Sequence, residues 1–317
     1  SDVNFDTKDL MGSIPHRNLA YSGRFTYAYK DKYMAEFNWG YTGSENFEHG
    51  KQFGFFPAVS AGWVISEESF VKKAMPWLDM FKIRGSYGEV GNDELDGRRF
   101  PYITLVDKDE SGSYAFGEFG TNTVLGYRIK TLGTPYLTWE VAKKYDIGVD
   151  FSIFNGKFTG TVDYFVDKRD DIFMQRNQMP LTTGLADQTP MANVGKMKST
   201  GWDGNIAYTQ QVGKVNLQFR ANFTYQTTDI LDKDEAANEL WYKMDRGFQL
   251  NQSRGLIALG LFKDQEDIDS SPSQKSLANK TILPGDIKYK DVNGDGVIND
   301  DAVSYTHLRA HETRGNL

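Results

Sequence analysis

Residues 144–168 read KYDIGVDFSIFNGKFTGTVDYFVDK, and this stretch decides the fold class. Apolar residues alternate with polar ones on both sides of Asn155-Gly156, which is the period of a β-strand with one apolar and one polar face. Asn and Gly both tolerate the positive φ angles that a tight type I′ turn requires. The stretch therefore predicts a two-faced β-hairpin whose apolar face is rich in Phe and Tyr.

The same alternation recurs along the chain and predicts about eight strands, longer than the strands that are usual in soluble sheets. Besides the hairpin, strands are expected at 19–30, 33–42, 53–66, 81–88, 202–211 and 215–226. Long loops are expected at 89–138 and 169–200, and mostly loop after residue 227. Because the short connections all fall at one rim, this all-β pattern is typical of an antiparallel transmembrane β-barrel segment.

The two faces of the expected strands differ in a way that favours a membrane wall over a soluble sandwich. A sandwich would pack the aromatic face between two sheets. Charged residues in mid-strand instead indicate a water-filled interior, as in a barrel. We therefore expect Tyr21, Phe37, Trp39, Phe151, Phe219 and Phe223 to face lipid, and Arg24, Glu36, Asp150 and Arg220 to face the lumen.

Composition excludes several classes of protein. The absence of Cys excludes a disulfide scaffold and thiol chemistry. A net charge of −7, with no run rich in Lys or Arg, argues against nucleic acid as a partner. No window approaches 18 consecutive apolar residues, so a membrane-spanning helix is not expected. The first residues, SDVNFDTKDL, carry no signal-peptide pattern, so an exported protein would begin upstream of them.

Several long motifs carry a resemblance to one family. They are YTGSENFEHGKQFGFFPAVSAGWVISEESF (41–70), FKIRGSYGEVGND (81–93), LTWEVAKKYDIGVDFSIFNGKFTGTVDYFVDKRDDI (137–172), GLFKDQEDIDSSP (260–272) and PGDIKYKDVNGDGVIND (284–300). Together they resemble the barrel of SusC/RagA-type TonB-linked outer-membrane transporters of the Bacteroidetes, over roughly residues 18 to 301.

The resemblance implies a function and a set of partners. The family imports oligosaccharides or peptides through a large plugged barrel under a SusD-like lipoprotein, with energy supplied through TonB. This chain matches the middle to late part of such a barrel, so its contacts with TonB would lie in segments outside it. The implied surroundings are outer-membrane lipid and a glycan or peptide substrate. The alternative is a soluble carbohydrate-binding or adhesin-like β-domain, which would not partition with the membrane.

A slice of a barrel would have two unpaired edges, at Leu19–Lys30 and Val215–Gln226. In lipid, unpaired backbone groups cost several kcal/mol each. In water, long open edges promote aggregation. We therefore expect residues 1–317, expressed alone without detergent, to aggregate.

The expected domain organisation is a partial barrel domain at 1–302 and a tail at 303–317. The tail contains VSYTHLRAHET, which is similar to a translated transposase-type sequencing adapter and includes His307 and His311. We expect it to be foreign to the native protein; a genuine basic tail is the alternative.

One candidate metal site precedes the tail. Residues 291–299 read DVNGDGVIN and fit the first nine positions of an EF-hand-type calcium loop. The twelfth position, which should hold an acid, is Ala302. The alternative is an ordinary Asn/Asp/Gly turn. The expected calcium ligands are Asp291, Asn293, Asp295, the carbonyl of Val297, and Asn299.

No catalytic site is expected. His16 and His49 lack the context of a nucleophile and its base. The acid pairs Glu67-Glu68 and Asp170-Asp171 are expected to be solvated surface rather than a glycosidase pair. Two roles are open for the aromatic residues in the expected loops, stacking on sugar rings or packing within the loops. These residues are Tyr114, Phe116, Phe119, Trp241 and Tyr242.

Overall fold

The computed structural model describes residues 14–15, 17–120, 122–176, 182, 190–235, 240–277 and 281–305. They belong to two compact units, divided between Asp234 and Glu235. The nature of the 303–317 tail stays a prediction, because residues 306–317 lie outside the described part of the chain. None of the helices among the described residues is long and apolar enough to cross a membrane.

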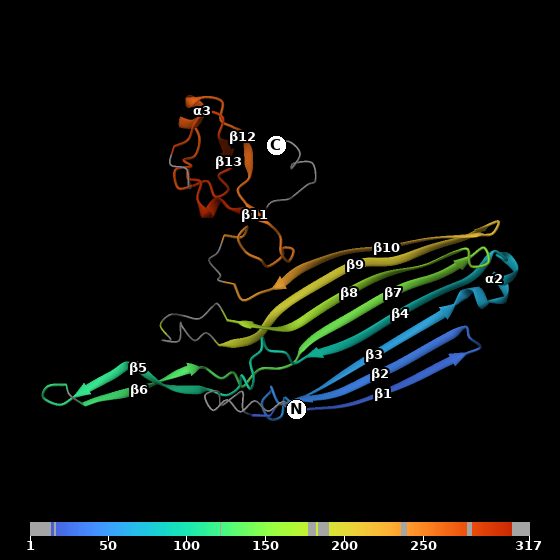
Figure 1. Ribbon diagram of the computed structural model, residues 1–317, viewed down its shortest axis with the longest axis horizontal. Coiled ribbons are helices and arrows are strands. Elements are labelled where there is room, and N and C mark those ends of the chain that lie inside the picture. The colour runs from blue at the N-terminus through green and yellow to red at the C-terminus, as the bar shows by residue number, and fades with distance from the viewer. Residues whose placement is uncertain are drawn as a thin grey trace. The chain divides into compact units, whose positions relative to one another are not determined.

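The first unit is built on one antiparallel sheet of eight strands in the order β1-β2-β3-β4-β7-β8-β9-β10 (Figure 1). Each strand pairs with its neighbour in that order, and β1 and β10 form the two edges of the described sheet. The strands are β1 (Asn18–Tyr29), β2 (Tyr33–Ser44), β3 (Phe53–Val64), β4 (Leu78–Asn92), β7 (Glu140–Ile153), β8 (Phe158–Gln175), β9 (Met191–Val212) and β10 (Val215–Asp232).

The connections alternate between the two rims, as predicted. At one end lie the turns β1–β2 and β9–β10, the β7–β8 turn, and a segment with a 3-10 helix η1 (Ile65–Glu67) and a helix α2 (Ser69–Ala74). We call this end the short-turn rim, and the opposite end the long-loop rim. In the β7–β8 turn Asn155 and Gly156 have φ of 58° and 74°, and Lys157 N donates to Phe154 O at 3.4 Å. The predicted turn is confirmed.

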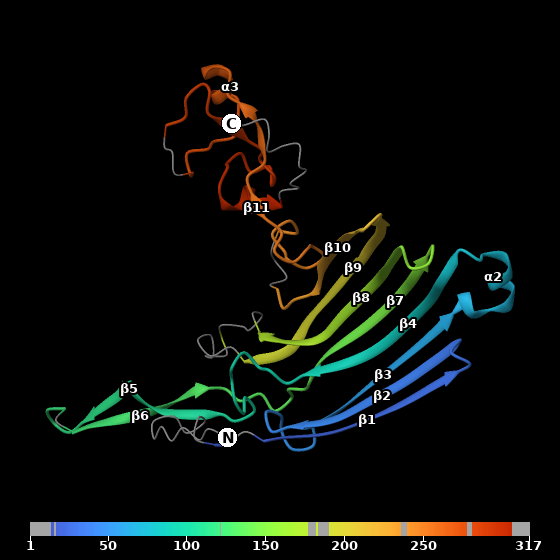
Figure 2. The ribbon, with the colours of Figure 1, turned by 45° about the vertical axis from the view of Figure 1, so that its right-hand side comes forward.

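Several predicted boundaries were wrong. The expected loop 169–200 is mostly strand, because β8 continues to Gln175 and β9 begins at Met191. Strand β4 runs on to Asn92, and β10 continues past residue 226 to Asp232. The predicted loop 89–138 contains a separate hairpin of β5 (Leu105–Phe116) and β6 (Asn122–Thr131), which extends away from the sheet in both views (Figures 1 and 2).

The register keeps one aromatic face across all eight strands. Tyr21 lies opposite Tyr41 and Phe25 opposite Phe37, and this parity holds through the middle of every pair to β10. The register shifts lie near strand ends, at 78–80, 169–173 and 230–232. All six residues expected to face lipid share this face: Tyr21, Phe37, Trp39, Phe151, Phe219 and Phe223. We call it the aromatic face, and the opposite one the polar face.

The aromatic face carries two bands of rings. From Tyr21 to Tyr29 the strand rises about 26 Å, at about 3.3 Å per residue. At the strand tilt of about 35–45° found in outer-membrane barrels, this rise corresponds to a height of about 19–22 Å, slightly less than their apolar band of about 25 Å. Between the bands lie aliphatic residues such as Val59, Val149 and Val162, together with the rings of Phe25, Phe37 and Phe223. The short-turn band contains Tyr29, Tyr33, Trp63, Phe151, Phe158, Tyr208 and Phe219, and the long-loop band Tyr21, Tyr41, Phe55, Tyr87, Tyr145, Tyr164, Trp202 and Tyr225.

The long-loop rim has a hydrophobic core of its own. Phe47, Leu95, Leu137 and Trp139 are buried together. Trp139 Nε1 donates to the carbonyl of Gln52 at 3.2 Å, which ties the start of β7 to the β2–β3 loop. These connections are therefore packed structure rather than free loop.

The second unit is small and mostly irregular. Its elements are β11 (Arg254–Gly255), β12 (Ala258–Leu261), α3 (Gln265–Asp269), β13 (Ile287–Tyr289), a 3-10 helix η4 (Asp300–Ala302) and β14 (Ser304–Tyr305). Strand β11 pairs with β14, and β12 with β13. Tyr242, Phe262, Ile298 and Ala302 are its buried apolar residues.

A pair of adjacent substitutions tests which face meets lipid. Val59 lies on the aromatic face and is 46% exposed, whereas Ser60 lies on the polar face opposite Glu36. In the full-length protein, Val59→Arg should cost about 2–4 kcal/mol, because it places a charge near the middle of the apolar band. Ser60→Arg at the same height should cost well under half of that. Folded protein on heat-modifiability gels, with denaturant midpoints, measures both. Equal costs would contradict the assignment of the faces.

Candidate functional site

The polar face is a continuous hydrogen-bonding surface, and it is the candidate site. The register brings Glu36 opposite Ser60, Ser60 opposite Ser86, and Ser86 opposite Asp146. The residues expected to face the lumen all lie on this face, as predicted: Arg24, Glu36, Asp150 and Arg220. Near one edge, Arg24 Nη2 lies 2.6 Å from Glu36 Oε2.

At the centre of the polar face, one arginine holds three aspartates. Arg84 Nε donates to Asp150 Oδ1 at 3.2 Å, and Nη1 to Asp146 Oδ1 at 3.3 Å. Nη2 lies 2.6 and 2.7 Å from the two carboxylate oxygens of Asp163. The planar guanidinium with its fixed donors suits such a set of acceptors. We call these four residues the Arg84 cluster; it joins β4, β7 and β8.

A glycine makes room for the cluster. Gly148 lies opposite Arg84 on one side and opposite Asp163 on the other. A Cβ at this position would lie 2.8 Å from Arg84 Cζ and would also overlap Asp163 Oδ1. Any larger residue would therefore separate Arg84 from Asp163.

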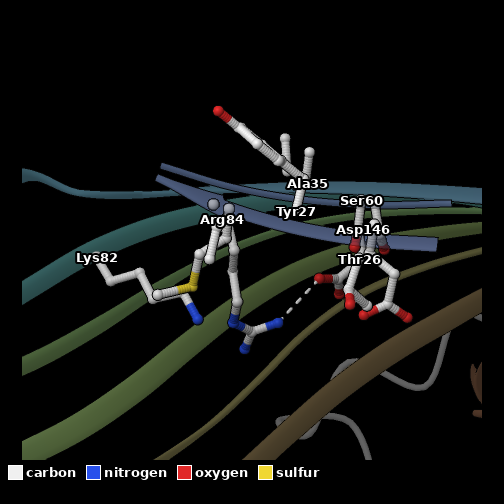
Figure 3. A pocket seen from close by; sticks show the side chains of 14 residues that line it. Thr26, Tyr27, Ala35, Ser60, Lys82, Arg84 and Asp146 are labelled. Atoms are coloured by element: carbon white, nitrogen blue, oxygen red, sulfur yellow. Dashed lines mark hydrogen bonds and ion pairs between the residues drawn. The ribbon is translucent and has the colours of Figure 1, made fainter. Parts of the chain in front are cut away.

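Beside the cluster the polar face is hollowed. A hollow of about 440 Å³ is lined by residues of β1 to β4 and by Asp146 of β7. In Figure 3 the side chains of Lys82, Arg84 and Asp146 lie on one side of the strands and that of Tyr27 on the other. The hollow is thus open to the polar face, and its lining offers donors from Lys82 and Arg84 and acceptors from Glu36 and Asp146.

The groups on this surface are suited to hydrogen bonding with polar solutes. The Arg84 cluster carries three carboxylates against one guanidinium, all partly open to solvent. No group of three or more His, Cys, Asp or Glu side chains that could hold a metal ion occurs in the described ranges. What the surface offers is a mixed array of donors and acceptors for polar solutes.

The structure brings together only three of the five predicted calcium ligands. Asp291 accepts from Gly294 N at 2.7 Å and from Gly296 N at 2.8 Å, which folds the loop around its carboxylate. Asn293 Nδ2 donates to Asp295 Oδ2 at 2.8 Å. The structure thus brings Asp291, Asn293 and Asp295 into one turn.

The other predicted positions of that loop make contacts that do not involve Asp291, Asn293 or Asp295. Asn299 Oδ1 accepts from Asp301 N at 2.7 Å and caps η4. Val297 pairs with Ser273 in an isolated bridge. Ala302, at the twelfth position, is fully buried. A salt bridge to Asp301 raises the pKa of Lys243, so a cation already lies beside the end of the loop.

The other residues singled out in the sequence have mixed outcomes. Tyr242 is buried and its hydroxyl donates to Asp301 O at 2.6 Å, so it packs the second unit. Trp241 and Phe119 are 71% and 84% exposed. His49 is exposed in the β2–β3 loop. The remaining histidines, His16, His307 and His311, lie outside the described residues.

The interpretation of Glu68 as solvated surface was wrong. Its carboxylate accepts from Tyr33 Oη at 2.8 Å, Trp63 Nε1 at 3.3 Å and Lys32 Nζ at 3.0 Å, and its side chain is 15% exposed. Sequence reasoning also missed the Arg84 cluster as a unit. The alternation of the sequence places its members on the polar face. Their contact with one another depends on the register between β4 and β7, which alternation does not predict.

Comparisons with known proteins agree with this geometry. The family model "TonB dependent receptor-like, beta-barrel" matches residues 4–272. TonB-dependent receptor P26 of Formosa agariphila is 30% identical over 318 residues, covering 93% of this chain and 30% of P26. TonB-dependent receptor SusC of Bacteroides thetaiotaomicron is 30% identical over 189 residues, covering 59% of this chain and 18% of SusC.

Among solved structures, the RagAB peptide importer in its "closed-closed" state is similar in fold. Its TM-score is 0.67 at 20% identity, covering 92% of this chain and 30% of that chain. The chain therefore spans less than a third of the length of these relatives. Its open eight-stranded sheet is a segment of a larger barrel wall. The chain belongs to the TonB-dependent receptor-like β-barrel family.

Proposed function

We propose that the chain is part of the wall of a TonB-dependent importer of oligosaccharides or peptides in the outer membrane of a Gram-negative, Bacteroidetes-like cell. The observation that carries this proposal is the polar face, continuous over eight strands and backed by the aromatic face. A wall with this polarity separates lipid from a water-filled interior. A sandwich would need a second layer on the aromatic face, and no such layer covers it within the described residues.

The chemistry of the polar face supports a polar, uncharged or mixed-charge solute. Donors and acceptors alternate along it, from Arg24 and Glu36 to the Arg84 cluster. Sugar hydroxyls and peptide groups are each both donor and acceptor, so either class suits the surface. The role of the chain in this proposal is passage of the solute, with no catalytic step.

The proposed partners follow from the family. We propose a SusD-like lipoprotein that meets the long-loop rim, where the buried cluster of Phe47, Leu95, Leu137 and Trp139 holds the connections in place. TonB would act through segments of the receptor outside this chain. The similar solved structure is named the RagAB peptide importer, which supports the importer proposal.

Deleting the gene of the full-length receptor tests the importer proposal. The mutant should lose growth on limiting oligosaccharide or peptide as sole carbon source, and wild-type receptor should restore it. A receptor lacking its TonB-contacting segment should not, because energy would no longer reach the barrel. A tag on the receptor should co-purify a lipoprotein from detergent-solubilised outer membrane. Unchanged growth of the mutant on all such substrates, or recovery of the receptor in the soluble fraction, would contradict the proposal.

The Arg84 cluster gives a second test of the lumenal surface. Arg84→Met should destabilise the full-length receptor by about 1–3 kcal/mol, because the nearly buried Asp163 loses its partner. Arg84→Lys should recover part of the loss, since lysine restores the charge but not the three-way geometry. Arg220→Met, on the polar face of β10, is the matched control and should cost little. Denaturant midpoints measure all three; equal values for Arg84→Met and Arg220→Met would contradict a structural role of the cluster.

We also propose calcium as a ligand of the loop at 291–299. Asp291, Asn293 and Asp295 already lie in one turn, and their oxygens are the hard ligands that calcium prefers. Asn299 and the carbonyl of Val297 would complete the protein ligands. The acid that closes such a loop is replaced by Ala302.

Restoring that acid tests the calcium proposal. Ala302→Asp in the full-length receptor should bind calcium with a dissociation constant of about a millimolar or lower. Ala302→Asn, which has nearly the same size but no charge, should bind distinctly more weakly. Isothermal titration with calcium chloride measures both variants. The absence of binding heat for Ala302→Asp would leave only an ordinary turn.

A further inference from the structure

The connection between β3 and β4 exposes an unusual set of side chains at the short-turn rim. Within α2 only Val71 is buried. Phe70 is 65% exposed, and Met75 and Trp77, which follow the helix, are 43% and 48% exposed. Large apolar side chains left in the open beside lysines are typical of segments that lie at a membrane surface.

The start of this connection is fixed to the aromatic face. Glu68, which precedes α2, accepts hydrogen bonds from Tyr33 and Trp63. Both of these rings belong to the short-turn band of the aromatic face, where they stack with centroids 6.2 Å apart. The connection therefore continues the lipid-facing surface at the level where Tyr and Trp of membrane proteins meet the headgroups.

The neighbouring β7–β8 turn adds a second exposed pair of rings. Trp77 and Phe154 stack with centroids 5.9 Å apart, and Phe154 N donates to Trp77 O at 3.0 Å. Phe154 is 54% exposed. The two connections thus present one aromatic surface, held together by a backbone hydrogen bond.

Two lysines of this surface form ion pairs, and Asp79 is held by a hydrogen bond from Gly156 N at 2.8 Å. Lys32 pairs with Glu68 at 3.0 Å and Lys72 with Glu67 at 2.5 Å. Hydrogen bonds from Tyr33 and Lys32 lower the pKa of Glu68, so its carboxylate stays ionised and neutralises Lys32. Lys73 has no acidic partner among the residues that the structure describes.

We propose that this surface anchors the barrel wall in the phospholipid leaflet at the short-turn rim. Phe70, Met75, Trp77 and Phe154 enter the interface between headgroups and acyl chains, and Lys73 binds a headgroup phosphate. The inference rests on the proposed function, since it requires the barrel to be in a membrane. Lysine near an apolar surface reaches such a phosphate while its stem stays among apolar groups.

Single-cysteine labelling tests the anchor. This chain has no native Cys, so a label within it attaches at the introduced cysteine. The full-length receptor, with cysteines elsewhere replaced, is reconstituted in phosphatidylethanolamine vesicles with a minority of phosphatidylglycerol. A fluorophore at Phe70→Cys should lose at least about half of its emission when nitroxide-headgroup lipid is included. A label at Phe119→Cys, on the hairpin of β5 and β6, should lose little.

A label at a third position distinguishes a wrong anchor from a wrong membrane location of the barrel. Ile147 is 62% exposed on the aromatic face, so a label at Ile147→Cys should be quenched by lipid with nitroxide on its acyl chain. Quenching at 147 but not at 70 would overturn the anchor and leave the barrel in the membrane. Quenching at neither position would overturn both the anchor and the membrane location. Quenching at both supports the anchor.

The phosphate contact has its own readout. Lys73→Gln should weaken binding of phosphatidylglycerol, counted by native mass spectrometry of the detergent-solubilised receptor, by about fivefold. Lys108→Gln, an exposed lysine of β5, is the matched control and should leave it unchanged. Equal binding by wild type and Lys73→Gln would overturn the role given to Lys73, whatever the labels report.

Discussion

The backbone ladder keeps one parity through the middle of every strand pair, and the rest of this structure depends on that constraint. Away from the long-loop rim, where the Phe47 cluster packs against strand residues, neither face of the eight-stranded sheet has a protein core behind it within the described residues. Cohesion therefore comes from strand pairing, and a slip of one residue at any pair would exchange aromatic and polar side chains from there on. The register at Tyr21–Tyr41, Phe81–Phe151 and Tyr164–Trp202 keeps rings with rings across the sheet. Both the lipid side and the lumenal side follow from that single alignment.

Glycine and aromatic residues work together on this sheet. A Cβ at Gly23 would lie 2.5 Å from Trp39 Nε1, and one at Gly160 would lie 2.7 Å from Phe151 Cζ. In each pair the ring covers the backbone of the glycine on the neighbouring strand. This arrangement recovers packing where glycine offers no side chain, and it lets the sheet curve. The wall thus accounts for part of the abundance of both residue types, while other glycines, such as Gly50 and Gly97, adopt positive φ in the connections.

The sequence predicted the faces well and the boundaries poorly, for one physical reason. Alternation is a local property, so the turn at Asn155-Gly156 and the position of Asp150 on the polar face could be predicted directly. Where alternation fades, as in 169–175 and 191–200, strands β8 and β9 still continue, because pairing with neighbours sustains them. The Arg84 cluster was out of reach, since its register is set across the long connection from Asn92 to Glu140. Likewise Glu68 is an ordinary acid in the sequence, and only the meeting of two turns gives it partners.

The two rims differ in how firmly their connections are held. At the long-loop rim, Asn193 bonds the backbone of Thr138 through both its oxygen and its nitrogen, each at 2.9 Å. These bonds fasten the start of β9 to the segment before β7. In the hairpin of β5 and β6 the ladder is interrupted by two register shifts. A two-stranded hairpin alone is marginally stable in water. It follows that the hairpin opens at lower free energy than the buried cluster at its base, and that motion at this rim is concentrated there.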